Sequence, residues 1–217
     1  AGCEPVFYDL PIDKEWGIPQ KTTPELVDVK GVKAVIVTSP SYEGIISDVE
    51  KIKEICRNNG AYFIIDEAHG ALYPFSDKLP QTAVNIADFT IQSLHKTAGG
   101  LNPTALLHVN CDCDASNALS MINTTSPSYP LLASIEANIN FLNSKRGRKK
   151  IETLISLIEE IKNSTNNVEF GGDDITKILI KKSGMTGFEL SEKLFDEFDI
   201  EDEKIYEDKR LEVNGNI

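Results

Sequence analysis

Short apolar runs alternate with helix-like stretches through the first half of the chain. One helix is predicted from Ser47 to Asn59, because Ser47 can cap it, Glu50 follows three residues later, and Gly60 comes after its end. The apolar runs are typical of buried strands. They lie at Val32 to Thr38, Tyr62 to Ile65, Phe89 to Ile91 and Ala105 to Val109. The alternation predicts an α/β fold with a mostly parallel sheet and helices on both faces, which binds ligands beyond the carboxyl ends of its strands.

The pattern changes after Asn110, where helical periodicity takes over. Two helices are predicted, around Pro130 to Asn143 and, past a basic patch at residues 145–150, along Ile151 to Ile161. The remainder offers a strand at Ile175 to Lys181, a turn at Gly184 and a helix from Thr186 to about Phe198. We therefore expect a large domain over residues 1–145, and a linking helix with the beginning of a small α+β domain over residues 146–217.

Both ends of the chain indicate a fragment of a longer protein. The first residue is not Met, and Pro5 to Leu10 already has the pattern of an apolar strand entering a loop. The last segment is too short to close a second sheet. We expect sequence to be missing before Ala1 and after the C-terminal residue.

Composition narrows the class of partner. The 217 residues are 41% apolar and carry 22 basic against 34 acidic side chains, for a formal charge of −12. This balance argues against nucleic acid and anionic membranes as partners and is compatible with a small cationic substrate. No apolar stretch is long enough to span a bilayer and no secretory signal begins the chain, so a cytoplasmic location is expected. The four cysteines form neither a disulfide framework nor a zinc pattern, and we interpret them as ordinary thiols.

The segment YFIIDEAHG, from Tyr62 to Gly70, places Asp66 and His69 just beyond a buried strand. Helicases of the DEAH-box type use such an acidic pair to hold Mg²⁺, but they also require a phosphate cradle of the form GxxxxGK[ST]. The chain contains no such cradle. Its net charge is also unfavourable for a nucleic-acid motor.

A second use of this string needs a lysine on a neighbouring strand end, and QSLHKT supplies Lys96 directly after the strand Phe89 to Ile91. A lysine that forms a Schiff base with a cofactor needs an accessible neutral amine. A carboxylate such as Asp66 is needed to keep a pyridine nitrogen protonated, so that the ring can accept electrons. Taken singly, Lys96 would be a surface lysine and Asp66 a cap or an ion-pair partner. Together they predict a cofactor site.

Four ordered motifs carry a resemblance to a known family. They are TSPSYEG (38–44), DEAHG (66–70), SLHKT (93–97) and TTSPSY (124–129), and a fifth match joins DITK (174–177) to GMTG (184–187). The chain resembles the ornithine/lysine/arginine decarboxylases over roughly residues 1 to 205. This resemblance implies the large domain of the pyridoxal 5'-phosphate (PLP)-dependent transferases of fold type I, incomplete here, and PLP as the cofactor.

The resemblance also implies roles for individual residues. Lys96 would hold PLP as a Schiff base, Asp66 would pair with the pyridine nitrogen, and Ala68 would pack against one face of the ring. Ser93 and His95 would contact the phosphate. His69 is open: it would either approach the cofactor or substrate, or orient the loop.

Further expectations concern the subunit interface and the substrate. Thr125 and Ser126 would lie near the phosphate of a partner subunit, which implies a homodimer with shared active sites. The reaction would be loss of CO₂ from a basic amino acid, namely lysine, ornithine or arginine. The chain departs from the family at Leu72 and Tyr73 and in residues 97–103, and these departures affect the substrate more than the cofactor. The family's phosphate cradle and ring-stacking side chain would precede Ala1.

Two alternatives remain at this stage. Aminotransferases and acyl-transferring PLP enzymes share the fold, and some carry a DEAH-like string before the lysine, although the His95-Lys96 pair favours a decarboxylase. The other alternative is a non-catalytic fragment that retains only packing and dimerisation. Because the phosphate cradle is missing, the isolated chain is expected to bind PLP weakly or not at all, and to be inactive.

Overall fold

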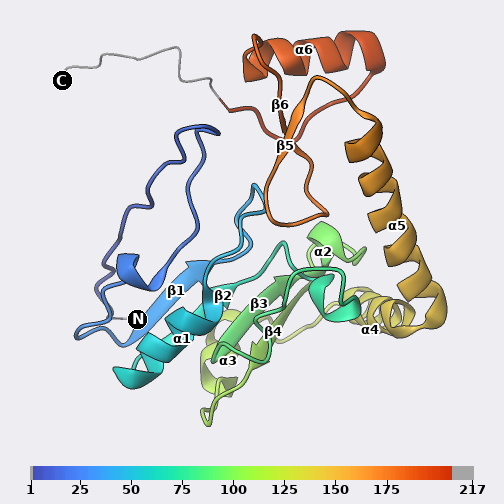
Figure 1. The fold of residues 1–217 in the computed structure, drawn as a ribbon. Helices are drawn as coiled ribbons and strands as arrows, with labels where there is room; N and C mark the ends of the chain where they lie inside the picture. The colour runs from blue at the N-terminus through green and yellow to red at the C-terminus, as the bar shows by residue number, and fades with distance from the viewer. Residues whose placement is uncertain (1, 207–217) are drawn as a thin grey trace.

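Four strands form the central sheet of the computed structural model, which describes residues 2–206 (Figure 1). The strands are β1 (Ala34–Thr38), β2 (Tyr62–Asp66), β3 (Phe89–Ser93) and β4 (Ala105–Val109), and they lie in that order across the sheet. The first three are parallel, and β4 runs antiparallel to β3. The predicted α/β fold with a mostly parallel sheet is therefore confirmed.

One face of this sheet is buried under helix α1 (Val49–Asn58). Successive strand residues point to opposite faces, so every second residue of β1 and β2 is buried. Ile52 and Cys56 of α1 are fully buried against this face. The strand side chains of this core are Val35, Val37, Phe63 and Ile65.

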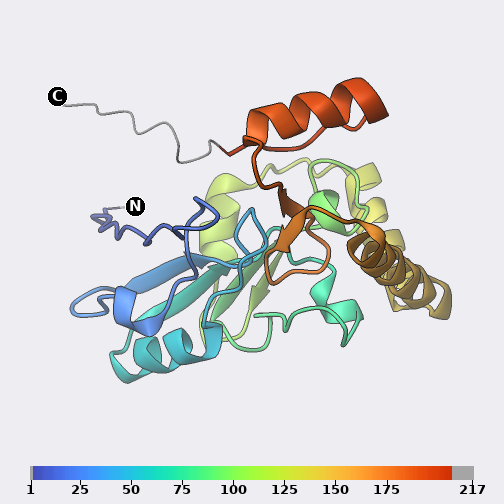
Figure 2. The same ribbon diagram turned by 45° about the horizontal axis from the view of Figure 1, so that its top comes forward.

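The opposite face is much more open. Helix α3 (Ser116–Ile122) lies on this side of the sheet, opposite α1, as the two views in Figures 1 and 2 show, but it buries none of its own residues. Ile36 remains 64% exposed and Tyr62 46% exposed, and in β4 Leu107 and Val109 are also exposed. Helices thus lie on both sides of the sheet, but only one face is packed.

Helices α4 (Tyr129–Asn143) and α5 (Lys145–Ser164) pack against each other and form a second core. Leu142, Ile151 and Ile155 are buried there with Leu94 and Ala98 from the short helical turn that follows β3. The basic patch lies in the first turns of α5, whose N-cap Ser144 accepts a hydrogen bond from the Gly147 backbone at 3.1 Å. The predicted helices in this region are confirmed, with α5 extending beyond both predicted ends.

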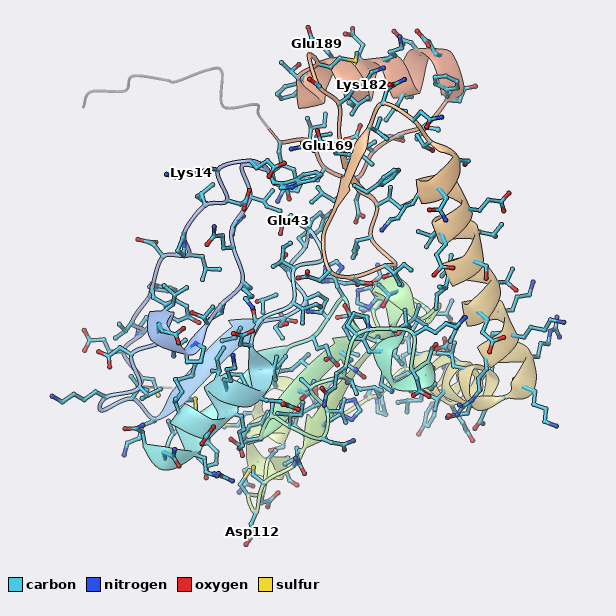
Figure 3. All side chains as sticks on the ribbon, viewed as in Figure 1. Lys14, Glu43, Asp112, Glu169, Lys182 and Glu189 are labelled. Carbon is cyan, nitrogen blue, oxygen red and sulfur yellow. The ribbon has the colours of Figure 1, made fainter. Side chains whose placement is uncertain are left out.

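Helix α5 leads to a small second unit (Figure 1). It consists of the antiparallel strands β5 (Glu169–Gly171) and β6 (Leu179–Lys181), followed by helix α6 (Gly187–Phe198). Thr186 and Glu189 form a capping box at the start of α6, where Figure 3 labels Glu189. The domain boundary near residue 145 stays a prediction.

Three local predictions are wrong. Residues 5–10 form no strand, and Phe7 is 87% exposed. Ser47 does not cap α1, because its hydroxyl accepts a hydrogen bond from the Thr22 backbone at 3.1 Å instead. The strand expected from Ile175 is limited to β6, because the Asp174 side chain accepts hydrogen bonds from Thr176 and holds that stretch in a turn.

Within residues 2–206, no helix is both long enough and apolar enough to cross a membrane.

Candidate functional site

Three loops meet where the parallel strands end. The loop after β1 bonds to the end of β2, since the Ser39 backbone donates to the Asp66 carbonyl at 3.0 Å. The loop after β2 bonds to β3, since the Glu67 backbone donates to the Ile91 carbonyl at 2.8 Å. Because parallel strands end at the same edge, motifs far apart in sequence come together here.

Asp66 is the last residue of β2 and is half-buried. Its Oδ1 accepts a hydrogen bond from the backbone N–H of Ala68 at 3.0 Å, which turns the chain sharply after the strand. Ala68 is 7% exposed. The side chain of Asp66 shares its sheet face with Ile64 and Ile36, which places this carboxylate at the carboxyl end of the open face.

Glu67 points to the opposite, packed side of the sheet, where its hydrogen bonds stabilise the fold. It is 2% exposed, and its carboxylate accepts hydrogen bonds from Thr82 at 2.7 Å, from the Ala83 backbone at 2.7 Å and from Gln92 at 2.6 Å. Burial raises the pKa of Glu67, and these three donors partly oppose the rise. Glu67 therefore fixes the base of the DEAHG loop, while Asp66 and His69 are left on the accessible side.

His69 lies at the centre of a polar cluster that it forms with Tyr42, Lys96 and Lys177. Its Nε2 lies 3.4 Å from Nζ of Lys96, and its Nδ1 lies 3.0 Å from Nζ of Lys177. The ring of Tyr42 packs edge-on against it, with 5.3 Å between the ring centroids. Burial lowers the pKa of His69, and the nearby charges of Lys177 and Lys96 lower it further, so the imidazole is neutral at neutral pH.

Lys96 lies on α2 (Leu94–Thr97), a single turn that follows β3 directly. Its side chain is exposed, whereas Leu94 is fully buried and holds the turn against the second core. Ser93, at the end of β3, is 9% exposed. Nδ1 of His95 lies 2.9 Å from the carbonyl oxygen and 3.2 Å from the backbone nitrogen of Thr104. This ring nitrogen is therefore hydrogen-bonded to the backbone of Thr104.

Thr125 and Ser126 lie apart from this cluster in the segment between α3 and α4. Both are exposed, and the Ser126 backbone donates to the Thr124 hydroxyl at 3.2 Å. Within residues 2–206, neither side chain forms a hydrogen bond or ion pair with Lys96 or Asp66. Their expected role at a partner's phosphate stays a prediction.

Sequence reasoning did not assign two residues of the cluster, Tyr42 and Lys177. Tyr42 belongs to the motif that follows β1, and the rule that parallel strands end at one edge could have placed it beside the DEAHG loop. Lys177 is 108 residues from His69 in the chain, and only the folded second unit brings it near. The motif DITK contains Lys177, but no sequence pattern indicates that this lysine lies beside His69.

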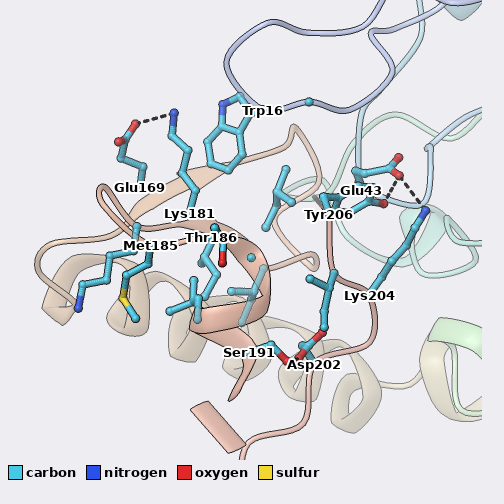
Figure 4. A pocket seen from close by; sticks show the side chains of 18 of the residues that line it. Trp16, Glu43, Glu169, Lys181, Met185, Thr186, Ser191, Asp202, Lys204 and Tyr206 are labelled. Atoms are coloured by element: carbon cyan, nitrogen blue, oxygen red, sulfur yellow. Dashed lines mark hydrogen bonds and ion pairs between the residues drawn. The ribbon is translucent and has the colours of Figure 1, made fainter. Parts of the chain in front are cut away.

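A cavity of about 620 Å³ opens beside this cluster. Tyr42 and Lys177 line it together with residues of the second unit and of the loop that carries Trp16 (Figure 4). Nζ of Lys181 lies 4.7 Å from the centroid of the Trp16 ring and forms ion pairs with Glu15 and Glu169. The cavity thus borders Tyr42 and Lys177, which both contact His69, whereas His69 itself does not line it.

The model of the family "Orn/Lys/Arg decarboxylase, major domain" matches residues 12–208. The chain belongs to the Orn/Lys/Arg decarboxylase family. The arginine decarboxylases of Bacillus anthracis and Bacillus subtilis (strain 168) are each 31% identical to it over 227 aligned residues, which cover 93% of this chain and 46% of theirs. The chain therefore spans about half the length of the curated relatives it matches. The constitutive lysine decarboxylase of Escherichia coli is 28% identical over 54% of this chain and 17% of its own length.

Solved structures support the fold. The apo cysteine desulfurase of Thermococcus onnurineus NA1 matches with a TM-score of 0.58 at 19% identity, over 80% of this chain and 50% of that one. The cysteine desulfurase CsdA of Escherichia coli matches with a TM-score of 0.57 at 14% identity, over 79% and 48%. At these identities the likeness shows the fold type I architecture alone.

The Orn/Lys/Arg decarboxylases use PLP, and the residues at this edge fit part of that cofactor. A primary amine (Lys96) and a carboxylate (Asp66) are the groups that its aldehyde and its ring nitrogen require. Buried oxygens of Thr97 and Thr104 next to α2 have no hydrogen-bond partner among the described residues. Helix α2 is too short to supply a strong N-terminal dipole for a dianionic phosphate.

Proposed function

We propose that this chain is the part of a PLP-dependent decarboxylase that carries the cofactor lysine, and that the longer protein removes CO₂ from a basic amino acid. The convergence of Asp66, His69 and Lys96 at one edge of the sheet carries this proposal. Membership of the Orn/Lys/Arg decarboxylase family supports it.

The proposed roles follow from position. Lys96 supplies an exposed primary amine at the end of β3, where it would hold the cofactor and be displaced by the substrate amine. PLP, when bound, supplies a ring that accepts the electron pair left by departing CO₂. Asp66 would hold a proton on the ring nitrogen, and the Ala68 N–H that binds its Oδ1 keeps this carboxylate oriented. Ala68 offers a small surface beside the ring, and Ser93 and His95 would contribute to phosphate binding.

His69 would act beside the reacting atoms. As a neutral imidazole 3.4 Å from Nζ of Lys96, it can give or take a proton at Nε2. We infer that His69 assists the proton transfers that accompany exchange of Lys96 for the substrate amine.

The substrate and the assembly are proposed at the level of class. Relatives are named as arginine and lysine decarboxylases, which supports a basic amino acid without choosing among lysine, ornithine and arginine. We propose a cytoplasmic homodimer in which the exposed Thr125 and Ser126 face the partner's phosphate site. The isolated chain would be inactive, since it spans about half the length of its relatives and leaves one face of its sheet open.

Assays of the full-length gene product test this function. With lysine, ornithine and arginine in turn, we expect release of CO₂ and the corresponding amine, and no keto acid. Borohydride reduction with PLP, followed by peptide mapping, should label Lys96. The matched variants are Lys96→Ala, which should lose both activity and label, and Lys78→Ala at another exposed lysine, which should keep both. Keto-acid formation without CO₂, or a label on another lysine, would contradict the proposal.

A further inference from the structure

Two lysines flank the imidazole of His69, one at each ring nitrogen. Lys177 lies 3.0 Å from Nδ1 and Lys96 lies 3.4 Å from Nε2. A neutral imidazole has one N–H donor and one acceptor nitrogen, whereas an ammonium group can only donate. The two lysines therefore cannot both donate to the neutral ring as ammonium ions. Only one of the two contacts can therefore be a hydrogen bond from an ammonium group to the ring.

The surroundings keep the ring neutral. Burial is the largest cause that lowers the pKa of His69, and Lys177 and Lys96 add to it, while Glu203 and Asp66 act in the opposite direction. Tyr42 packs edge-on and brings no charge, because a hydrogen bond with Glu203 raises the pKa of its phenol. The question is thus which of the two lysines donates to the ring.

Two observations favour Lys177 as the donor. Its contact with the ring is the shorter one, and hydrogen bonds with an ionised donor are shorter than neutral ones. Its Nζ also lies 5.9 Å from the centroid of the Tyr42 ring, whose face attracts a cation.

The chain holds Lys177 in this place from two sides. The backbone of Lys177 donates to the Asp174 carbonyl at 3.0 Å, and Asp174 in turn donates through its backbone to the Gly44 carbonyl at 2.9 Å. Gly44 has φ +85°, and a Cβ there would come within 2.9 Å of the Lys177 side chain. A glycine at this position therefore lets the second unit approach closely enough to reach His69.

We propose that Lys177 is a positioning residue, which donates to Nδ1 of His69 and thereby places the ring hydrogen on Nε2, facing Lys96. With its hydrogen on Nε2, the ring accepts no hydrogen bond from Lys96, so the imidazole does not hold Nζ of Lys96. This inference rests on the proposed function only in treating Lys96 as the cofactor lysine. The second unit thus determines which ring nitrogen of His69 faces Lys96 with a hydrogen.

The tautomer of His69 is directly measurable. Long-range ¹H–¹⁵N spectra of the full chain without cofactor, labelled with ¹⁵N-histidine and recorded well above the pKa of His69, should show the Nε2–H form. The spectrum of His69→Gln identifies its signals among the three histidines. Lys177→Met should shift the population toward Nδ1–H, and Lys177→Arg should keep Nε2–H, because a guanidinium also donates.

Two controls separate this effect from a general disturbance. Lys182→Met changes a lysine beyond the end of β6 and should leave the tautomer unchanged. His108 is an internal control, because its Nε2 lies 3.0 Å from Oε1 of Gln92, an acceptor, and should carry hydrogen in every variant. An Nδ1–H form of His69 in the unmodified chain, or an unchanged Nε2–H form in Lys177→Met, would overturn the proposal.

A labelling experiment distinguishes failure of this inference from failure of the proposed function. Borohydride trapping of PLP on Lys96 of the full-length protein reports the function alone, and the spectra report the tautomer whether or not PLP binds. If both proposals hold, Lys177→Met slows labelling of Lys96 and Lys177→Arg restores it. Equal rates in the unmodified protein and in Lys177→Met would contradict the link to Lys96.

Discussion

The phenol of Tyr73 donates a hydrogen bond of 2.7 Å to Oδ2 of Asp174, across 101 residues of sequence. Tyr73 is 5% exposed and lies in the 3₁₀ turn Tyr73–Phe75 after the DEAHG loop, and Asp174 is 1% exposed and lies in the second unit. Burial and the nearby Asp174 charge raise the pKa of Tyr73, so the phenol keeps its proton and remains a donor. This bond ties the unit that carries Lys177 to the loop that carries His69.

Loss of this bond should cost stability. Tyr73→Phe removes the hydroxyl that donates to Asp174, so Oδ2 of this buried carboxylate loses that hydrogen bond. We expect the free energy of unfolding to fall by about 1–3 kcal/mol. Urea denaturation of Tyr73→Phe, Asp174→Asn and the double variant measures the coupling. Tyr62→Phe, at a tyrosine that is 46% exposed, is the matched control and should change stability by less than about 0.5 kcal/mol. Strictly additive single changes would show that the two side chains are not coupled.

Much of the sheet could be predicted because its signal is local. Each apolar run needs only its own residues to indicate a strand, and the four runs became β1 to β4. The direction of β4 and the role of Ser47 depend on contacts with other segments, so the local pattern did not indicate them. Ser47 matches a helix cap in sequence, but its hydroxyl accepts a hydrogen bond from the backbone of Thr22 instead.

The candidate site divides in the same way. Asp66 and Lys96 could be proposed because each follows a strand, and the ends of parallel strands share an edge. Lys177 could not, because its position depends on the turn at Asp174 and on the close approach at Gly44. The chemistry carried by the strand ends is thus visible in sequence, whereas the contribution of the second unit appears only after folding.

Asp66 should be essential for activity of the full-length protein. Asp66→Asn keeps the size of the side chain but removes the charge that would keep the ring nitrogen protonated. We expect kcat to fall by at least about 100-fold, with cofactor attachment to Lys96 largely retained. Asp77→Asn, at an exposed aspartate, should leave kcat unchanged. Full activity of Asp66→Asn, measured as amine release, would remove Asp66 from the proposed mechanism.

Glu67 should make stability depend on pH. Burial raises its folded pKa above the ordinary value of 4.5, so the folded state holds this proton more tightly than the unfolded chain. The resulting stability is present below the unfolded pKa and is lost as pH rises through the folded pKa. Urea unfolding of the chain relative to Glu67→Gln should therefore show an advantage that declines from about pH 4.5 upward. Glu152→Gln, at an exposed glutamate, should show no such decline, and a flat difference for Glu67→Gln would contradict the assignment.

The open face of the sheet should make the isolated chain self-associate. Ile36 is 64% exposed in the middle of β1, beside Ile64 of β2, and the exposed Leu107 and Val109 extend the apolar surface across β4. Contiguous apolar surface of this kind favours association and binding of apolar dyes. Ile36→Lys should reduce both dye fluorescence and the mass measured by light scattering, because it places a charge on that face. Leu157→Lys, at a residue of α5 that is 52% exposed, is matched in chemistry but lies outside the sheet and should have little effect. Equal effects of the two variants would assign the association to general surface hydrophobicity and not to this face.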